Sequence, residues 1–224
     1  DLRINLIYRA TEELRSNFQS SAMGGSGPQL IYGPSDQVGP FATMGIIQPL
    51  DTLFEESFFT GFVENSIIEF QNKKWMVGDV VGNHLMLIYN KKLIQFPPKN
   101  TDELINEGKA LTRDMDGDGK IDQYGLVWNF TEPFFYAPWL GGFGGWLITV
   151  DNKPDLNTEA NEKGFAFIKS LRDVHGIIPR ECDYEIANAM FLGGDAAMII
   201  NGDWSWGNYM GKVDFGIARI PMVS

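Results

Sequence analysis

The chain has 224 residues, enough for one large domain or two small ones with a substantial core. Its 18 Lys and Arg against 29 Asp and Glu give a formal net charge of −11, which argues against nucleic acid or an anionic membrane surface as the partner. The single cysteine, Cys182, excludes an intramolecular disulfide and a cysteine-based metal site, and two histidines are too few for a histidine-rich metal centre.

Short strands and helices are predicted for the first part of the chain. Residues 2–8 alternate apolar and polar side chains and predict a strand, and residues 11–22 predict a helix that ends at Gly24-Gly25. Residues 30–32 predict a second, buried strand. The patterns that follow predict a short helix and turn over 41–50, helical pieces over 52–71, and strands over 75–79 and 85–89.

The second part of the chain alternates strands with amphipathic helices. A capped helix is expected from Thr101, and short buried strands are expected over 125–128 and 197–200. The clearest helix covers 158–174, and its core-facing side carries Phe165, Ile168 and Leu171. This alternation predicts an α/β fold with a largely parallel sheet.

One uncharged stretch, residues 133–150, is long enough to suggest a membrane span. Pro138 and four glycines within it would interrupt a lipid-exposed helix, so no membrane-spanning segment is expected.

A carboxylate and two indoles follow the predicted strand at 197–200. Asp203, Trp204 and Trp206 come directly after the turn-like Asn201-Gly202, and ligands bind at the carboxyl ends of strands in open α/β sheets. An indole can cover the apolar C–H faces of a sugar while the acid accepts hydrogen bonds from its hydroxyls. Two interpretations of these tryptophans remain open. In the platform interpretation they stack on a sugar, and in the core interpretation they are buried in the protein, as most tryptophans mainly are.

A second aromatic cluster follows the strand predicted at 125–128. Glu132 stands at the start of a helix, where its carboxylate could accept sugar hydroxyls, and Phe134 could present a ring face. The alternative is that Glu132 stabilises the helix terminus.

The acidic stretch from 114 to 122 has the spacing of a calcium-binding loop. Carboxylates stand at loop positions one, three, five and nine, a glycine stands at position six, and the carbonyl of Lys120 is at position seven. The residue at position twelve is Gly125, where a complete helix–loop–helix calcium site has Glu. A structural calcium ion is expected, and an acidic loop without an ion is the alternative. The four carboxylates belong to Asp114, Asp116, Asp118 and Asp122.

Several of these segments together resemble a known family. The stretches Leu87–Lys91, Thr131–Phe134 and Ala197–Trp204 are similar to those of the extracytoplasmic sugar-binding proteins of bacterial ATP-binding-cassette importers, most closely the maltose/maltodextrin-binding branch. The resemblance implies an α/β, two-lobed periplasmic-binding-protein fold of the class II type, here truncated at both ends. It places part of the first lobe at 1–81, a hinge crossover at 82–85 and most of the second lobe at 86–224.

The same resemblance implies a function and a set of contacts. The protein is expected to bind a maltodextrin-like oligosaccharide in an interlobe cleft and deliver it to the membrane permease of an importer. It would act as a monomer outside the cytoplasm, in the periplasm or lipid-anchored, without enzymatic activity or a required cofactor. The implied contacts are Asp36 in the first lobe, Glu132 and Phe134 in the second, and Trp204 as the stacking platform. Asn83 stands where the family has a hinge-side Glu.

Three positions depart from the pattern of the maltodextrin branch. Besides Asn83, the chain has Gly33 where an aromatic residue is usual and Asp203 where proline precedes the platform tryptophan. These departures leave open which sugar is bound. Two other interpretations remain, a glycoside hydrolase that uses a pair of carboxylates and a truncated fragment that no longer binds sugar.

Overall fold

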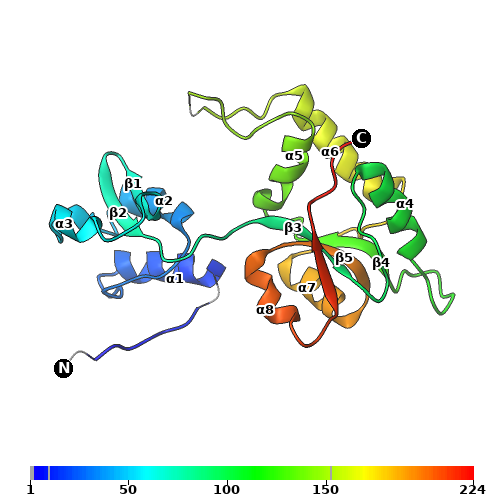
Figure 1. Ribbon diagram of the computed structural model, residues 1–224, viewed down its shortest axis with the longest axis horizontal. Coiled ribbons are helices and arrows are strands. Elements are labelled where there is room, and N and C mark those ends of the chain that lie inside the picture. Colours follow the sequence, from blue (N-terminus) through cyan, green and yellow to red (C-terminus); the bar gives the residue numbers. More distant parts are fainter. Residues whose placement is uncertain (1–2, 10, 152) are drawn as a thin grey trace. The chain divides into compact units, whose positions relative to one another are not determined.

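The chain divides into two compact units, Asp1–Val81 and Gly82–Ser224 (Figure 1). The computed structural model describes residues 3–9, 11–151 and 153–224. The second unit begins at Gly82.

The first unit is built from short helices and one hairpin. Its helices are α1 (Thr11–Met23), α2 (Val38–Thr43) and α3 (Glu56–Phe59), and the hairpin joins β1 (Ile67–Phe70) to β2 (Lys73–Val77). Both residues of the hairpin turn have positive φ, as a two-residue turn between right-twisted strands requires. A small aromatic core lies beneath α1 and α2, where the Phe18 and Phe41 ring centroids are 4.9 Å apart.

Two strands predicted for this unit do not form. Residues 3–9 and 30–32 have no strand pairing, and Leu6 and Leu30 are 90% and 84% exposed. Residue 2 lies outside the described residues. The physical reason is that a strand needs a hydrogen-bonding partner, and in the described part of this unit β1 and β2 pair only with each other. An alternation of apolar and polar residues favours an extended strand with one apolar face, but it does not show whether a partner strand is present.

The second unit contains a four-stranded mixed sheet of order β4-β5-β3-β6. Its strands are β3 (Leu85–Asn90), β4 (Tyr124–Trp128), β5 (Ala196–Gly202) and β6 (Phe215–Ala218). Only β4 and β5 are parallel, whereas β3 runs antiparallel to both β5 and β6. The prediction of a largely parallel sheet is therefore wrong. A continuous apolar run in a strand indicates that both faces of the sheet are covered, but it does not indicate whether the strand is parallel or antiparallel to its neighbours.

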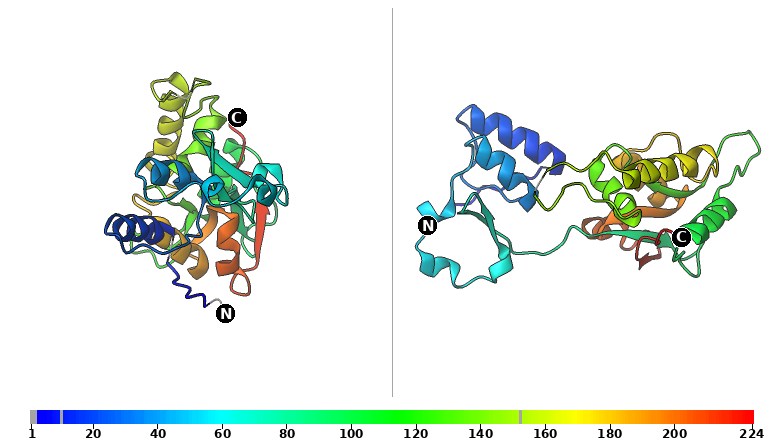
Figure 2. Two further views of the ribbon diagram at one scale, coloured as in Figure 1. Left: turned by 90° about the vertical axis from the view of Figure 1, so that its left-hand side faces the viewer. Right: turned by 90° about the horizontal axis from the view of Figure 1, so that it is seen from above.

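Helices cover both faces of this sheet. Alternate residues of the strands face opposite ways, so that Leu126 packs into one apolar cluster and Val127 into another. The first cluster is closed by α4 (Thr101–Leu111), α5 (Ala137–Gly142) and α6 (Glu159–Asp173), and α6 lies over the strands in the view from above (Figure 2). The second cluster is closed by α7 (Tyr184–Gly193) and α8 (Trp206–Tyr209).

Most boundaries of these helices follow from capping. The side chains of Asn100, Thr158 and Asp183 accept hydrogen bonds from the backbone at the starts of α4, α6 and α7. Gly194 ends α7 in the left-handed conformation with φ of 89°. None of the helices within the described ranges is long and apolar enough to cross a membrane.

The buried face of α6 differs from the prediction at one residue. Leu171 is fully buried and Ile168 is partly buried, as expected. Phe165 is 57% exposed, so its prediction as a core residue is wrong. Its ring instead stacks on Tyr136, with centroids 4.4 Å apart and an interplanar angle of 12°. The apolar stripe of α6 is narrower than the sequence suggests.

Candidate functional site

The predicted contact residues of the second unit follow or precede strand ends that meet on one side of its sheet. Because β4 and β5 are parallel and β3 is antiparallel to them, the ends of β4 and β5 meet the start of β3, with Leu85 opposite Gly202. The segments just beyond these strand ends carry the polar and aromatic side chains. They are Asn83, His84, Glu132, Phe134, Asp203 and Trp204.

Trp204 is an exposed indole held in a defined orientation. The residue lies in a 3₁₀ turn over Asp203–Ser205, directly after β5, and it is 43% exposed. The indole nitrogen donates a hydrogen bond to the hydroxyl of Tyr184 at 3.0 Å. The backbone of Gly202 also comes so close that a Cβ there would lie 1.9 Å from the ring. The ring is thus fixed by its neighbours but open to solvent, which favours the platform interpretation over the core interpretation.

Trp206 has the opposite character. It begins α8, is partly buried and packs against the cluster that contains Phe191 and Tyr209. The core interpretation therefore applies to Trp206 and not to Trp204.

Phe134 lies beside this platform, and Glu132 stands two residues before Phe134 in the chain. The rings of Phe134 and Trp204 have centroids 6.2 Å apart at an interplanar angle of 46°. Glu132 precedes the 3₁₀ helix Pro133–Tyr136, and its side chain makes no capping hydrogen bond to that helix. The buried Asn129 approaches the Glu132 carboxylate through Nδ2 at 3.5 Å. A partly buried carboxylate and two aromatic rings thus lie on neighbouring segments.

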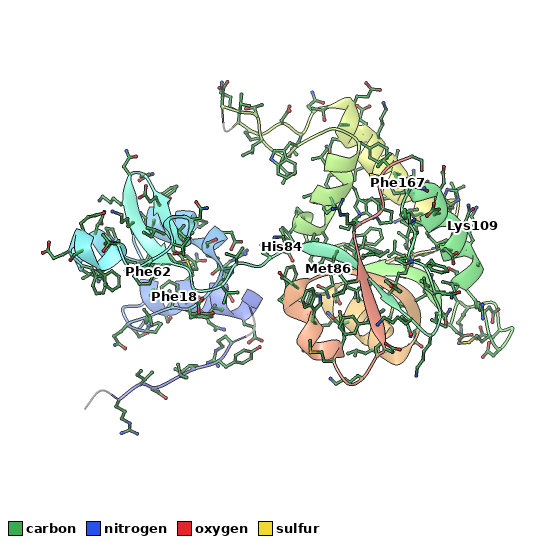
Figure 3. The ribbon with its side chains drawn as sticks, viewed as in Figure 1. Phe18, Phe62, His84, Met86, Lys109 and Phe167 are labelled. Carbon is green, nitrogen blue, oxygen red and sulfur yellow. The ribbon has the colours of Figure 1, made fainter. Side chains whose placement is uncertain are left out.

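Two residues at this edge were not among the predicted contacts. Tyr184 opens α7 and orients Trp204, and His84 precedes β3 at the point labelled in Figure 3. The Nδ1 atom of His84 lies 3.2 Å from Oδ2 of Asp203. Neither residue carries a local sequence signal for these contacts, because the partners are 20 and 119 positions away in the chain.

Asn83 and Asp203 are joined through the backbone. The N–H of Asn83 donates to Oδ1 of Asp203 at 3.0 Å. Burial of the Asp203 carboxylate acts to raise its pKa, but the hydrogen bonds from the His84 side chain and from the N–H groups of Asn83 and His84 outweigh this. The pKa of Asp203 is consequently lowered, and the group is ionised at neutral pH.

Asp36 belongs to the first unit. It lies in a 3₁₀ turn over Ser35–Gln37, its side chain is 62% exposed, and its carboxylate is 3.9 Å from a guanidinium nitrogen of Arg15. Its oxygen atoms therefore remain accessible to a hydroxyl donor within that unit.

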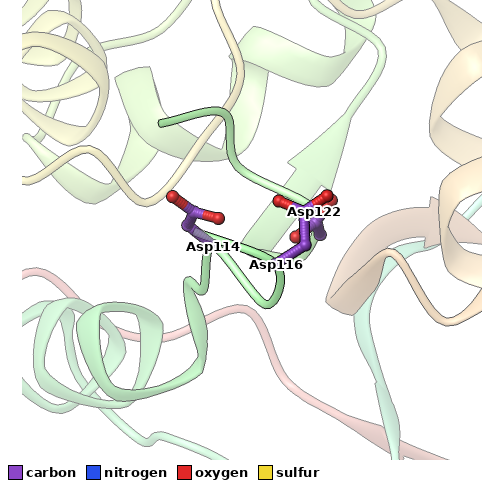
Figure 4. Close-up of side chains that lie close together, drawn as sticks. All are labelled: Asp114, Asp116 and Asp122. Atoms are coloured by element: carbon purple, nitrogen blue, oxygen red, sulfur yellow. The ribbon is translucent and has the colours of Figure 1, made fainter. Parts of the chain in front are cut away.

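The acidic loop brings three carboxylates together. One oxygen each of Asp114, Asp116 and Asp122 lies within 4.8 Å of the others (Figure 4). The backbone N–H groups of Gly119 and Gly117 donate to Asp114 at 2.9 and 2.7 Å, and these bonds lower its pKa. This spacing is compatible with oxygen ligands of one hard cation.

The carboxylate of Asp118, the fourth acidic side chain of the loop, contacts Lys120 instead. Asp118 contacts the ammonium group of Lys120 at 3.2 Å and accepts a hydrogen bond from the Lys120 backbone N–H at 2.8 Å. The loop therefore also neutralises part of its own charge, as the alternative without an ion requires. The calcium site stays a prediction.

Cys182 has no features of a reactive thiol. It is buried, and burial together with the neighbouring Asp183 raises its pKa to about 11.

Comparison with known proteins identifies the family. The family model described as bacterial extracellular solute-binding protein matches residues 1–223, and the chain therefore belongs to this family. It is a family of solute-binding proteins and not of enzymes, and its fold is the two-lobed one that the sequence predicts.

The similar proteins include several that are named for maltotriose or maltodextrin, and one named for galacto-oligosaccharides. The structure of the maltose/maltodextrin-binding domain MalE from Bdellovibrio bacteriovorus bound to maltotriose is 61% identical, with a TM-score of 0.90, and the match covers 97% of this chain and 57% of that chain. The Thermus thermophilus maltotriose-binding protein bound with maltotriose is 27% identical with a TM-score of 0.78, covering 96% of this chain and 58% of that one. The maltotriose-binding protein of Pyrococcus abyssi is 25% identical, covering 98% of this chain. The chain spans about half the length of the curated relatives it matches, 48% in the last case.

Proposed function

We propose that the protein binds an α-1,4-linked gluco-oligosaccharide of the maltotriose class. The observation that carries the proposal is the exposed, oriented indole of Trp204 beside the ring of Phe134. The 61% identity to a domain solved with maltotriose supports the choice of sugar.

The chemistry of such a site is simple. Glucose units have apolar C–H faces, and covering on the order of 50–100 Å² of them at about 25 cal/mol/Å² contributes roughly 1–2.5 kcal/mol. The Glu132 carboxylate accepts hydrogen bonds from the ring hydroxyls, and bonds of this charged type contribute about 1.5–3 kcal/mol each. Within the second unit, Asn83 supplies a further amide to the same ligand.

The transport role follows from the family. We propose that the protein works outside the cytoplasm, in the periplasm or lipid-anchored, as a monomer that delivers its sugar to the permease of an ATP-binding-cassette importer. The description of the family as extracellular supports this location, as does a similar protein of Streptococcus pneumoniae that is named as a maltooligosaccharide ABC transporter solute-binding lipoprotein.

Calorimetric titration tests the sugar assignment. Maltotriose should bind with a stoichiometry near one, while sucrose and a galactose trisaccharide at equal concentration should produce no comparable heat. The same samples should release no reducing ends on prolonged incubation, since a hydrolase would need a carboxylate pair roughly 5 to 9 Å apart across one bond. Absence of maltotriose binding would overturn the proposal.

We propose separately that calcium occupies the loop at 114–122 as a structural ion, held by Asp114, Asp116, Asp118, the Lys120 carbonyl and Asp122. The support is the spacing of these oxygens along the chain and the approach of three of the carboxylates. The ion would stabilise the loop and take no part in sugar binding.

A further inference from the structure

Both carboxylate oxygens of Asp203 already have partners within the protein. Its Oδ1 accepts the backbone N–H of Asn83 at 3.0 Å, and its Oδ2 lies 3.2 Å from Nδ1 of His84. Because an ionised carboxylate only accepts hydrogen bonds, a hydrogen bond in this contact requires a proton on Nδ1 of His84. The Asp203 side chain is 23% exposed and the His84 side chain 68% exposed. Both oxygens are therefore directed at the segment through which the chain enters the second unit.

That segment has an unusual backbone. Among the described residues, the non-glycine positions with positive φ are Gln71, Asn72 and Asn83. The first two form the turn of the β1–β2 hairpin, which requires this conformation. Asn83, with φ of 75°, belongs to no hairpin. A left-handed residue outside a tight turn persists when its surroundings hold it, and here the contact that holds it is the carboxylate of Asp203.

Gly82 permits this contact. A Cβ at Gly82 would lie 3.2 Å from Oδ2 of Asp203, so a larger residue would press on the carboxylate. The β3–β5 ladder ends at the Leu85–Gly202 pair, and the Asp203 side chain continues the connection one step beyond that end. Asp203 is also the residue directly before Trp204 and begins the same 3₁₀ turn.

We propose that Asp203 is a positioning residue that fixes the left-handed crossover at Asn83 and the turn carrying Trp204 in one arrangement. This inference rests on the proposed function in that Trp204 is taken as the sugar platform. Asp203 itself need not touch the sugar. Its carboxylate sets where the indole stands relative to the segment that enters the second unit.

The two partners of Asp203 should differ in importance. The His84 side chain is 68% exposed, and exposed contacts of this kind contribute little because water and salt screen them. The backbone bond from Asn83 goes to a charged, partly buried acceptor, which makes it the stronger of the two. Loss of the His84 imidazole should therefore have a much smaller effect than loss of the Asp203 carboxylate.

The experiment compares four variants of the full 224-residue chain with the parent. Asp203→Ala removes both contacts, Asp203→Asn keeps an acceptor oxygen, and His84→Ala removes only the side-chain pair. The matched control is Asp214→Ala, since Asp214 is paired with Lys91 at 3.5 Å at the opposite end of β3. The readouts are maltotriose affinity, hydrogen–deuterium exchange over 82–86, and the indole N–H signal of Trp204, assigned with Trp204→Phe.

Asp203→Ala is expected to weaken maltotriose binding about tenfold, to speed exchange over 82–86 and to shift the Trp204 indole signal. Asp203→Asn should restore most of the parent's affinity, exchange rate and indole signal. His84→Ala and Asp214→Ala should match the parent in all three measurements. Parent-like exchange and an unshifted indole in Asp203→Ala would overturn the inference. If the parent itself binds no maltotriose, the proposed function fails, and the exchange and indole readouts alone decide the inference.

Discussion

The indole nitrogen of Trp204 donates a hydrogen bond to the hydroxyl of Tyr184, from a separate helix, at 3.0 Å. This bond, together with the close backbone of Gly202, explains how an exposed tryptophan keeps one orientation. A fixed ring loses little conformational entropy when a sugar stacks on it, so more of the stacking free energy appears as affinity.

Trp204→Ala is therefore expected to weaken maltotriose binding by roughly tenfold or more, because the stacking surface is lost. Calorimetry on the variant and the parent measures the change. Trp206→Ala is the matched comparison, since that indole packs against the apolar cluster beneath α8. It should lower the melting temperature before it changes affinity. Equal affinity for parent and Trp204→Ala would remove the platform assignment.

Tyr184→Phe should have a smaller effect than loss of the indole itself. The phenylalanine ring can fill the same space but cannot accept the hydrogen bond from Trp204, and a bond of this neutral type contributes about 0.5–1.5 kcal/mol. We expect affinity to fall about two- to tenfold with little change in melting temperature. A Tyr184→Phe variant that loses as much affinity as Trp204→Ala would indicate a direct sugar contact by the hydroxyl instead.

Calcium should raise the melting temperature of chelator-treated protein by mass action. The rise should be lost in Asp114→Asn and Asp122→Asn, whose carboxylates belong to the three that approach one another. Asp151→Asn, which changes an exposed carboxylate outside the loop, should retain it. An unchanged melting temperature of the parent on adding calcium would contradict the prediction.

The contribution of Asp203 to stability should depend on pH. Its pKa in the folded protein is lowered from the ordinary value of 3.8, so the contribution is fully present above that value and is lost as the pH falls through the lowered pKa. The difference in melting temperature between the parent and Asp203→Asn should therefore be largest above pH 3.8 and shrink in more acidic buffer. If the melting-temperature difference instead grew on acidification, the pKa of Asp203 could not be lowered in the folded protein.

Gly125→Ala should strongly destabilise the second unit. A Cβ at Gly125 would lie 2.4 Å from the Cα of Gly108, so β4 and α4 would have to move apart. The cost should be in the range of about 1–3 kcal/mol seen for overpacked cores. Gly207→Ala is the control, because nothing lies within 4 Å of a Cβ there. Denaturant unfolding of both variants measures the difference, and comparable stabilities would contradict the close packing.

The sequence predicted the second unit better than the first. Capped, amphipathic helices such as α6 and apolar strands such as β5 carry their signals locally, and both formed where expected. The strands expected at 2–8 and 30–32 depend on a partner, which no local pattern encodes. The direction of β3 was missed for the same reason, although it is the antiparallel course of β3 that brings Asn83 to the site edge.

The site was predictable to the extent that its residues follow strand ends. Trp204, Glu132 and Phe134 could be found in this way because each comes shortly after β4 or β5. Tyr184 and His84 could not, since their contacts join segments that are distant in the chain. Whether an acidic side chain faces a ligand or a backbone amide also depends on the folded backbone, as the contact between Asp203 and Asn83 illustrates.

The strand order has a mechanical consequence. The chain passes from residues 1–81 directly into β3, which lies between β5 and β6 and is antiparallel to both. Tension applied through the first unit therefore enters an interior strand at Leu85 and loads two ladders of hydrogen bonds together. Had the connection led into the edge strand β4 or β6, the same pull could have detached one ladder alone. Residues 219–224 leave the sheet through β6, an edge strand that pairs with β3 alone, so tension applied at that end loads a single ladder.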